Sequence, residues 1–184
     1  RSVACLTALC GLVLLVRPSW GVESTENAAL AYWQAFAQLP TVEEEIAKLA
    51  SEASTVTLDS RTKDLLKRCK GAFYSMRRAA LMPECDWGME LSAGPHAVMP
   101  HLAKSRQLAR YACLLARQQI ADGKKEKALE TIRDTFILAR HSGADDVLIS
   151  VLVQQAIEQL TIETVCREMP QFNAEQLQKL TGYV

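Results

Sequence analysis

Residues 100–139 read PHLAKSRQLARYACLLARQQIADGKKEKALETIRDTFILA and carry the strongest helical signal in the chain. Small residues recur every three or four positions in the first half of this stretch, at Ser105, Ala109, Ala112 and Ala116. This spacing places them on one helix face, where a second helix can approach closely. After a turn at 122–124, an apolar face returns at Ala128, Leu129, Ile132, Phe136 and Ala139. The stretch predicts a hairpin whose first helix covers 101–121 and whose second ends near Gly143.

Capping residues predict three more helices before this hairpin. Asn27 is a typical N-cap, and a proline stops the helix that follows it. Thr41 and Glu44 have the spacing of a capping box at the start of the next helix. Asp59 is the expected N-cap of a third helix, which continues through about Leu81. A loop rich in proline and glycine then leads to the hairpin.

Two further helices are expected after the hairpin. Asp145 or Asp146 starts the first, and residues 147–153 are apolar on nearly every side, which predicts that this helix is buried on several sides. Asn173 is the expected N-cap of the last helix, which we expect to be cut off at Val184. No stretch predicts a β-strand. The predicted fold class is therefore all-α, with antiparallel helical hairpins packed as a small bundle or a short array.

One part of the hairpin resembles a known repeat. Within residues 112–139, Ala128 follows Gly123 after five residues and Ile132 follows four residues later. These positions are similar to the small and apolar positions of a tetratricopeptide-type helical hairpin, although the proline that usually ends that repeat is missing. The resemblance implies a short tetratricopeptide-like array.

Overall charge gives no support for binding to nucleic acid. The chain has 21 basic and 21 acidic residues, so its formal net charge is zero. A protein that binds nucleic acid through its phosphates needs a clear positive excess. The basic residues that do gather in one region are expected to form one solvated helix face: Lys63, Lys67, Arg68, Lys70, Arg77 and Arg78.

The first residues are typical of a secretory leader. Residues 3–16 are VACLTALCGLVLLV, without a charge, between Arg1 and Arg17. This run is short for a membrane-spanning helix and fits the apolar core of a signal peptide. We expect residues 1–21 to be a signal peptide, incomplete at its N-terminus, and 22–184 to be one helical domain. The expected location is periplasmic or extracellular, and the alternative is a protein anchored in the membrane by this uncleaved segment.

A second resemblance covers more of the chain. Residues 27–32 (NAALAY), 85–88 (CDWG), 100–102 (PHL) and 106–110 (RQLAR) look like segments of an uncharacterised family of exported bacterial helical proteins. The resemblance implies an exported all-α protein. It brings no established activity, cofactor or binding residues with it.

The loop at 83–101 contains the residues most suited to chemistry. Cys85, His96 and His101 could bind zinc, with Cys69 or Cys113 as the fourth ligand. The paired cysteine spacing of structural zinc sites is absent, so we expect no metal and no cofactor. In the alternative interpretation Trp87 fills the core and Asp86 fastens the loop through backbone hydrogen bonds.

Nucleophilic catalysis also has weak support from the sequence. Cys85 or Ser92 could be activated by His96 or His101, but no recognised catalytic motif surrounds them. His141 lies at the end of a predicted helix, where its charge suits the helix dipole. We therefore expect no catalytic residues.

Four cysteines follow the leader, at positions 69, 85, 113 and 166. In an oxidising compartment they could form up to two disulfides. We expect at most one bridge, and Cys69 with Cys85 is the possible pair, since it would join the third helix to the loop after it. The alternative is that Cys113 and Cys166 are small buried residues on helix faces.

Two functions from different classes follow from these observations. The first is a non-catalytic scaffold or protein-interaction module outside the cytoplasm, which binds a protein or peptide. It predicts a concave apolar surface and no buried cluster of titratable groups. The second is an enzyme or metal-binding protein with its site in the loop at 83–101, and it predicts that Cys85, Asp86, His96 and His101 converge in a cleft.

Overall fold

The structure is a computed structural model, and it describes residues 27–40, 58–90, 98–145 and 147–182. The protein is all-α: in these ranges it has seven α-helices, one 3-10 helix and no strand. The predicted leader at 1–21 and the predicted helix at Thr41 lie outside the described residues. None of the described helices combines the length and the apolar character that spanning a membrane requires.

The predicted hairpin is confirmed. It consists of α5 (Pro100–Ala121) and α6 (Lys125–Ser142), which make the most extensive helix contact in the fold. All four small residues of the predicted seam on α5 are buried, as are the five apolar residues predicted for α6. Side chains of this size let the two backbones come close together, so the small-residue face of α5 is a packing seam.

The turn between α5 and α6 is a Schellman motif centred on Gly123. The amide of Gly123 donates to the carbonyl of Ile120 (2.9 Å), and the amide of Lys124 donates to that of Gln119 (2.7 Å). Gly123 has a φ of 75°, in the left-handed region that glycine adopts without strain. The glycine therefore fixes where α5 ends and how the chain reverses.

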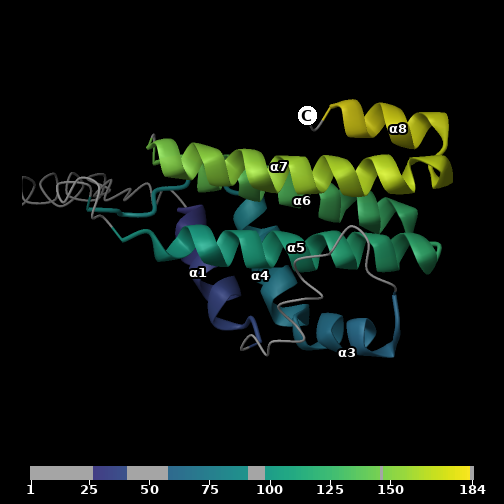
Figure 1. The fold of residues 1–184 in the computed structure, drawn as a ribbon, viewed down its shortest axis with the longest axis horizontal. Coiled ribbons are helices and arrows are strands. Elements are labelled where there is room, and N and C mark those ends of the chain that lie inside the picture. Colours follow the sequence, from purple (N-terminus) through teal and green to yellow (C-terminus); the bar gives the residue numbers. More distant parts are fainter. Residues whose placement is uncertain (1–26, 41–57, 91–97, 146, 183–184) are drawn as a thin grey trace, which may run out of the picture.

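Helix α7 (Leu148–Glu168) packs against both α6 and α5, so three long helices lie alongside one another (Figure 1). A 3-10 turn (Met169–Gln171) then leads into α8 (Ala174–Thr181), which returns over α7 and contacts α6. Asn173 caps α8 as predicted: its side chain accepts from the Gln176 amide (2.8 Å), and the side chain of Gln176 accepts in return from the Asn173 amide (3.2 Å).

On the other side of this layer, α1 (Ala28–Ala37) packs against α4 (Lys70–Ala80), and α3 (Ser60–Arg68) lies against α5. Asn27 and Asp59 cap α1 and α3, as predicted. The main core cluster lies where α1 and α4 meet the three long helices α5, α6 and α7. It is unusually rich in alanine, which lets α1 and α4 approach closely.

The prediction of one uninterrupted helix from Asp59 to Leu81 is wrong, because the chain breaks at Cys69 between α3 and α4. Cys69 has a ψ near 0° and is fully buried beside Leu65 and Leu66. Gly71 lies two residues further on, and a side chain there would meet that of Gln38, since a Cβ at position 71 would lie 2.0 Å from the Gln38 Oε1. The bend thus lets α3 cover α5 while α4 packs closely on the end of α1.

Two predictions about α7 are also wrong. Asp145 does not cap it: α7 starts at Leu148 after an extended Val147, with no side-chain cap. The carboxylate of Asp145 lies against His101 instead, and Asp146 lies outside the described residues. The first turns of α7 are not buried on several sides either, because four apolar residues there are exposed: Leu148, Ile149, Val151 and Leu152.

Candidate functional site

The sequence-predicted loop residues meet α1, α5 and α6 around the indole of Trp87. This side chain is buried and stacks on His101, with ring centroids 4.4 Å apart, and on Tyr32 at 5.7 Å. Its Nε1 donates a hydrogen bond to the backbone carbonyl of His141 (2.7 Å). Trp87 therefore fills the core with its polar atom satisfied, as the structural interpretation of this motif predicted.

Asp86 and Asn27 fasten the loop to the start of α1. The Asn27 side chain donates to the backbone carbonyl of Asp86 (2.7 Å) and accepts from the Asp86 amide (3.0 Å). Beside this pair, the Ala28 amide donates to the carbonyl of Glu84 (2.9 Å). The Asp86 carboxylate accepts from the Gly88 amide (2.8 Å), and Gly88 has a φ of 63°. Asp86 is thus engaged in a turn, which explains it without catalysis.

His101 is fully buried beside a carboxylate. Its Nε2 lies 3.0 Å from Oδ2 of Asp145, whose side chain is 9% exposed. Neither ring nitrogen of His101 meets hydrogen-bond geometry with any described residue. Burial lowers the pKa of His101 to about 4, so the imidazole is neutral at pH 7.

His141 and Tyr32 form a second buried polar contact in the same cluster. The Tyr32 hydroxyl lies 3.0 Å from Nδ1 of His141. Burial lowers the pKa of His141 and raises that of Tyr32 well above its usual value, so both groups are neutral. The prediction that no titratable groups cluster in the interior is therefore wrong. The sequence did not show this cluster, because its members come from four separate segments.

Only some of the loop residues that were predicted as candidates for catalysis or metal binding lie in the described part of the structure. His96 and Ser92 lie outside the described residues. Burial, followed by Asp145 and Asp86, raises the pKa of the Cys85 thiol to about 12, which keeps it protonated and a poor nucleophile or metal ligand. Among the described residues, no three His, Cys, Asp or Glu side chains are arranged to hold a metal ion.

All four described cysteines are free thiols in the structure, including Cys69 and Cys85, the pair named as a possible disulfide. Cys69 lies in the core between α3 and α5, whereas Cys85 packs against the main cluster around Trp87. Cys113 is buried on α5 as predicted, but Cys166 is exposed on α7, contrary to prediction.

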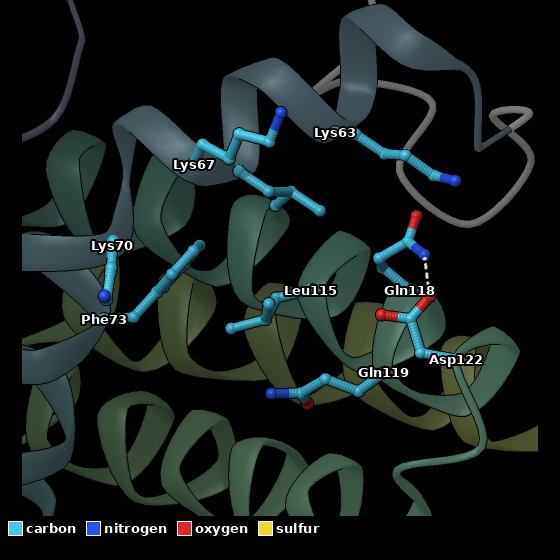
Figure 2. Close-up of a pocket in the computed structure, with 9 residues that line it drawn as sticks. Lys63, Lys67, Lys70, Phe73, Leu115, Gln118, Gln119 and Asp122 are labelled. Atoms are coloured by element: carbon cyan, nitrogen blue, oxygen red, sulfur yellow. Dashed lines mark hydrogen bonds between the residues drawn. The ribbon is translucent and has the colours of Figure 1, made fainter.

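A cleft of about 580 Å³ lies between α3, α4 and α5, away from the Trp87 cluster. Its apolar lining consists of Leu66 from α3, Phe73 from α4 and Leu115 from α5, and Figure 2 shows Phe73 and Leu115. Polar side chains complete the lining: Lys63, Lys67, Lys70, Gln118, Gln119 and Asp122. The cleft thus combines an apolar surface with a row of lysines at its rim.

The charge of this cleft is predominantly positive. Its one carboxylate, Asp122, is already engaged, because it accepts from Gln118 (2.6 Å, Figure 2) and pairs with Lys124 (3.1 Å). These hydrogen bonds lower the pKa of Asp122 and keep it ionised. Lys67 pairs at the surface with Asp64, whereas no ion pair within the described part of the chain involves Lys63 or Lys70. Three lysines thus line the cleft against one carboxylate.

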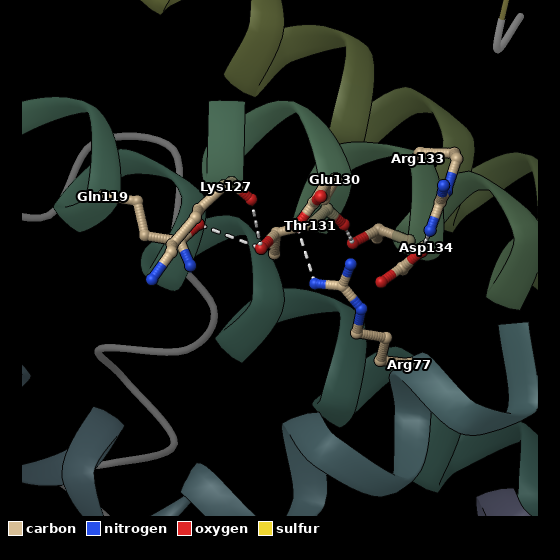
Figure 3. A network of polar contacts seen from close by, with 8 residues as sticks. Arg77, Gln119, Lys127, Glu130, Thr131, Arg133 and Asp134 are labelled. Carbon is tan, nitrogen blue, oxygen red and sulfur yellow. Dashed lines mark hydrogen bonds and ion pairs between the residues drawn. The ribbon is translucent and has the colours of Figure 1, made fainter. Parts of the chain in front are cut away.

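A polar network holds the helices around the cleft together (Figure 3). Gln119, at the cleft wall, accepts a hydrogen bond from Thr131 on α6 (2.9 Å). The preceding residue of α6, Glu130, pairs with Arg77 of α4 (2.6 Å). These contacts tie α4 and α5 to α6, so the cleft walls are parts of one packed unit.

The sequence predicted the lysines of the cleft but assigned them to a solvated helix face. Lys63, Lys67 and Lys70 are spaced four and three residues apart, which is the signal that they share one face. The partners from α5, Leu115 and Gln118, could not be found from the sequence, since they reach the cleft only through tertiary packing. In comparisons with known proteins, no family model, curated protein or solved structure matches this chain.

Proposed function

We propose that the protein is a non-catalytic helical interaction module that acts outside the cytoplasm and binds a partner segment in the cleft between α3, α4 and α5. The partner segment carries carboxylates and at least one large apolar side chain. The observation that carries this proposal is the apolar floor at Leu66, Phe73 and Leu115, lined by the ammonium groups of Lys63, Lys67 and Lys70.

The chemistry of the cleft favours a peptide over a small anion. A cleft of about 580 Å³ accommodates several side chains, and its floor offers hydrophobic contact that inorganic phosphate cannot use. The lysines stand at the rim as separate ammonium groups, which suits carboxylates spaced along a peptide. We place the protein outside the cytoplasm because residues 1–21 are typical of a secretory leader.

Fluorescence anisotropy with designed peptides tests this proposal. A labelled peptide that alternates Glu with Leu or Phe should bind, whereas a peptide with Lys in place of Glu, or with Ser in place of the apolar residues, should not. Binding should weaken as salt is raised, since exposed charges are screened within about 8 Å at physiological ionic strength.

Variants then locate the site. Lys63→Glu combined with Lys70→Glu should weaken binding at least tenfold, whereas Lys104→Glu, an exposed lysine on α5 outside the cleft, should leave it unchanged. Equal loss in both variants would show a non-specific charge effect. If no peptide of either composition binds, or if the Lys63 and Lys70 double variant binds as well as the wild type, the proposal is wrong.

A further inference from the structure

Helix α7 presents one face to the core and a second, largely apolar face to solvent. The face toward the core consists of six buried residues: Ser150, Val153, Ile157, Thr161, Thr164 and Glu168. The opposite face, which we call the outer stripe, consists of seven exposed residues: Leu148, Leu152, Gln155, Gln159, Ile162, Cys166 and Met169. Met169 is the residue directly after the end of the helix.

This outer stripe is unusual for a surface helix. Helices at the surface of a soluble protein normally turn charged residues toward water. The outer stripe contains no charged residue, and its large apolar members are far from buried: Leu148 is 76% exposed, Leu152 49%, Ile162 42% and Met169 43%. Ile149 and Val151 extend the exposed surface at the first turn of the helix. An uncharged and largely apolar face of this kind marks an interaction surface.

The spacing of the outer stripe indicates what covers it. Its members follow one another at alternating intervals of four and three residues, over the whole of α7. This is the heptad spacing with which one helix packs along another. The occupant is therefore a helix at least as long as the stripe, and α7 of a second copy has that length and pattern.

A two-fold axis across α7 matches the outer stripe with itself. In an antiparallel pair, Leu148 of one copy meets Cys166 of the other, Leu152 meets Ile162, and Gln155 meets Gln159. Apolar side chains then face apolar side chains, and the glutamine amides face each other, where each can donate and accept. A shift by one layer in either direction would place glutamines against apolar residues. We infer that the outer stripe of α7 is the interface of a homodimer with antiparallel helices.

The acidic residues beside the outer stripe favour this orientation over a parallel one. In a parallel pair, Glu158 of each copy would face Glu163 of the other, which gives two like-charged contacts. In the antiparallel pair there is one like-charged contact between these acidic residues, and it joins the two copies of Glu158. Each of these carboxylates already accepts a hydrogen bond from Gln154 (2.8 Å).

The area available agrees with a reversible dimer. The exposed apolar residues of α7 offer on the order of 500 Å² per copy, or about 1,000 Å² for the pair, which is near the lower limit of specific interfaces. We therefore expect dimer at high and monomer at low protein concentration. The inference is independent of the cleft, which is lined by α3, α4 and α5.

Analytical ultracentrifugation of the full chain between about 1 and 200 μM tests the interface, because a small interface dissociates within such a concentration range. The wild type should shift from monomer to dimer, and Leu152→Glu should remain monomeric throughout. Leu81→Glu is the matched control, because Leu81 is an equally large residue, 69% exposed, outside α7. Circular dichroism checks that both variants are folded. A wild type that stays monomeric, or a Leu152→Glu variant that still forms dimers, would overturn the inference.

Disulfide trapping tests the orientation in a Cys166→Ser background. Leu152→Cys with Ile162→Cys should form a covalent dimer on mild oxidation, whereas Leu152→Cys alone should not. Rapid trapping by Leu152→Cys alone would show a parallel pair and contradict the antiparallel arrangement. A monomer that binds anionic lipid vesicles, and loses this binding in Leu152→Glu, would assign the outer stripe to a membrane surface and also overturn the inference.

Discussion

The indole of Trp87 lies almost flat on the imidazole of His101, with ring planes 18° apart and centroids separated by 4.4 Å. The same indole donates its one hydrogen to the backbone of His141, at the end of α6. A residue of the loop after α4 thereby joins the first turn of α5 to the last turn of α6. The most distinctive motif in the sequence is thus a structural junction.

Trp87→Ala should destabilise the fold strongly. Truncation of a buried Trp removes its hydrophobic contact and leaves a cavity, at a cost of about 3–5 kcal/mol. Trp87→Phe keeps most of the packing but leaves the His141 carbonyl without its donor, so we expect a loss of about 1–2 kcal/mol. Urea unfolding followed by circular dichroism measures both values. Equal stability of the alanine variant and the wild type would show that Trp87 does not hold this junction.

The stability of the protein should fall as the pH is lowered through the range from about 6.5 to 4. In the unfolded chain His101 takes up a proton near pH 6.5, whereas in the folded protein burial lowers its pKa to about 4. Between these values the unfolded state binds more protons, so acid favours unfolding. The Asp145 carboxylate 3.0 Å away opposes this effect, and we expect His101 to account for on the order of 1–2 kcal/mol.

The pH effect is measured from unfolding free energies at several pH values, for the wild type and for His101→Gln. The variant should show a smaller loss of stability between pH 7 and 4.5. Its remaining loss includes His141, whose pKa is lowered by burial in the same direction. Parallel pH profiles for the two proteins would show that His101 is not buried in its neutral form.

The buried ion pair between Arg117 and Glu168 should be costly to break from one side. Arg117 Nε lies 3.1 Å from Glu168 Oε1, and both side chains are about nine-tenths buried. Glu168→Gln leaves the guanidinium without its countercharge, which typically costs about 3–5 kcal/mol. Arg117→Met combined with Glu168→Leu removes both charges and should recover most of this loss. A double-mutant cycle of unfolding free energies measures the coupling energy between Arg117 and Glu168. If the effects of the two single substitutions add, this predicted coupling is absent.

Gly123→Ala should lower stability by about 1–2 kcal/mol, because the left-handed backbone at this turn is strained for a residue with a Cβ. Gly123→Asn should cost less, since asparagine tolerates this region better than alanine. Space is not the cause, because a Cβ at position 123 would meet no atom within 4 Å. Thermal unfolding of the two variants measures the difference, and an alanine variant as stable as the wild type would contradict the strain argument.

The helices could be predicted where their signals are local. Asn27, Asp59 and Asn173 cap helices within three residues of themselves, and Gly123 sets its own turn, so neighbouring sequence is enough to find them. The break at Cys69 has no such local signal: Cys69 is buried against Leu65 and Leu66 of α3 and Tyr111 and Leu114 of α5, and α5 is distant in the sequence.

The same distinction holds for the residues of the candidate sites: local signals could be predicted, and contacts between distant segments could not. The spacing of Lys63, Lys67 and Lys70 already shows that they share a face, but the floor at Leu115 belongs to a helix some 50 residues later in the chain, and only packing brings it there. Asp145 has the appearance of a helix cap in the sequence, yet the desolvated His101 is its neighbour in space. An apolar run such as 148–152 has the same composition whether it is buried or exposed, so the exposure of α7 could not be predicted.

The junction at Trp87 also sets an order in which the fold can be completed during synthesis. Tyr32 contacts His141, which lies 109 residues later in the sequence, and Trp87 donates its hydrogen bond to the backbone of the same residue. Before α6 is made, α1 can pack on α4, but the contacts of Tyr32 and Trp87 with His141 cannot form. The core around Trp87 is therefore completed only after α6 has been synthesised.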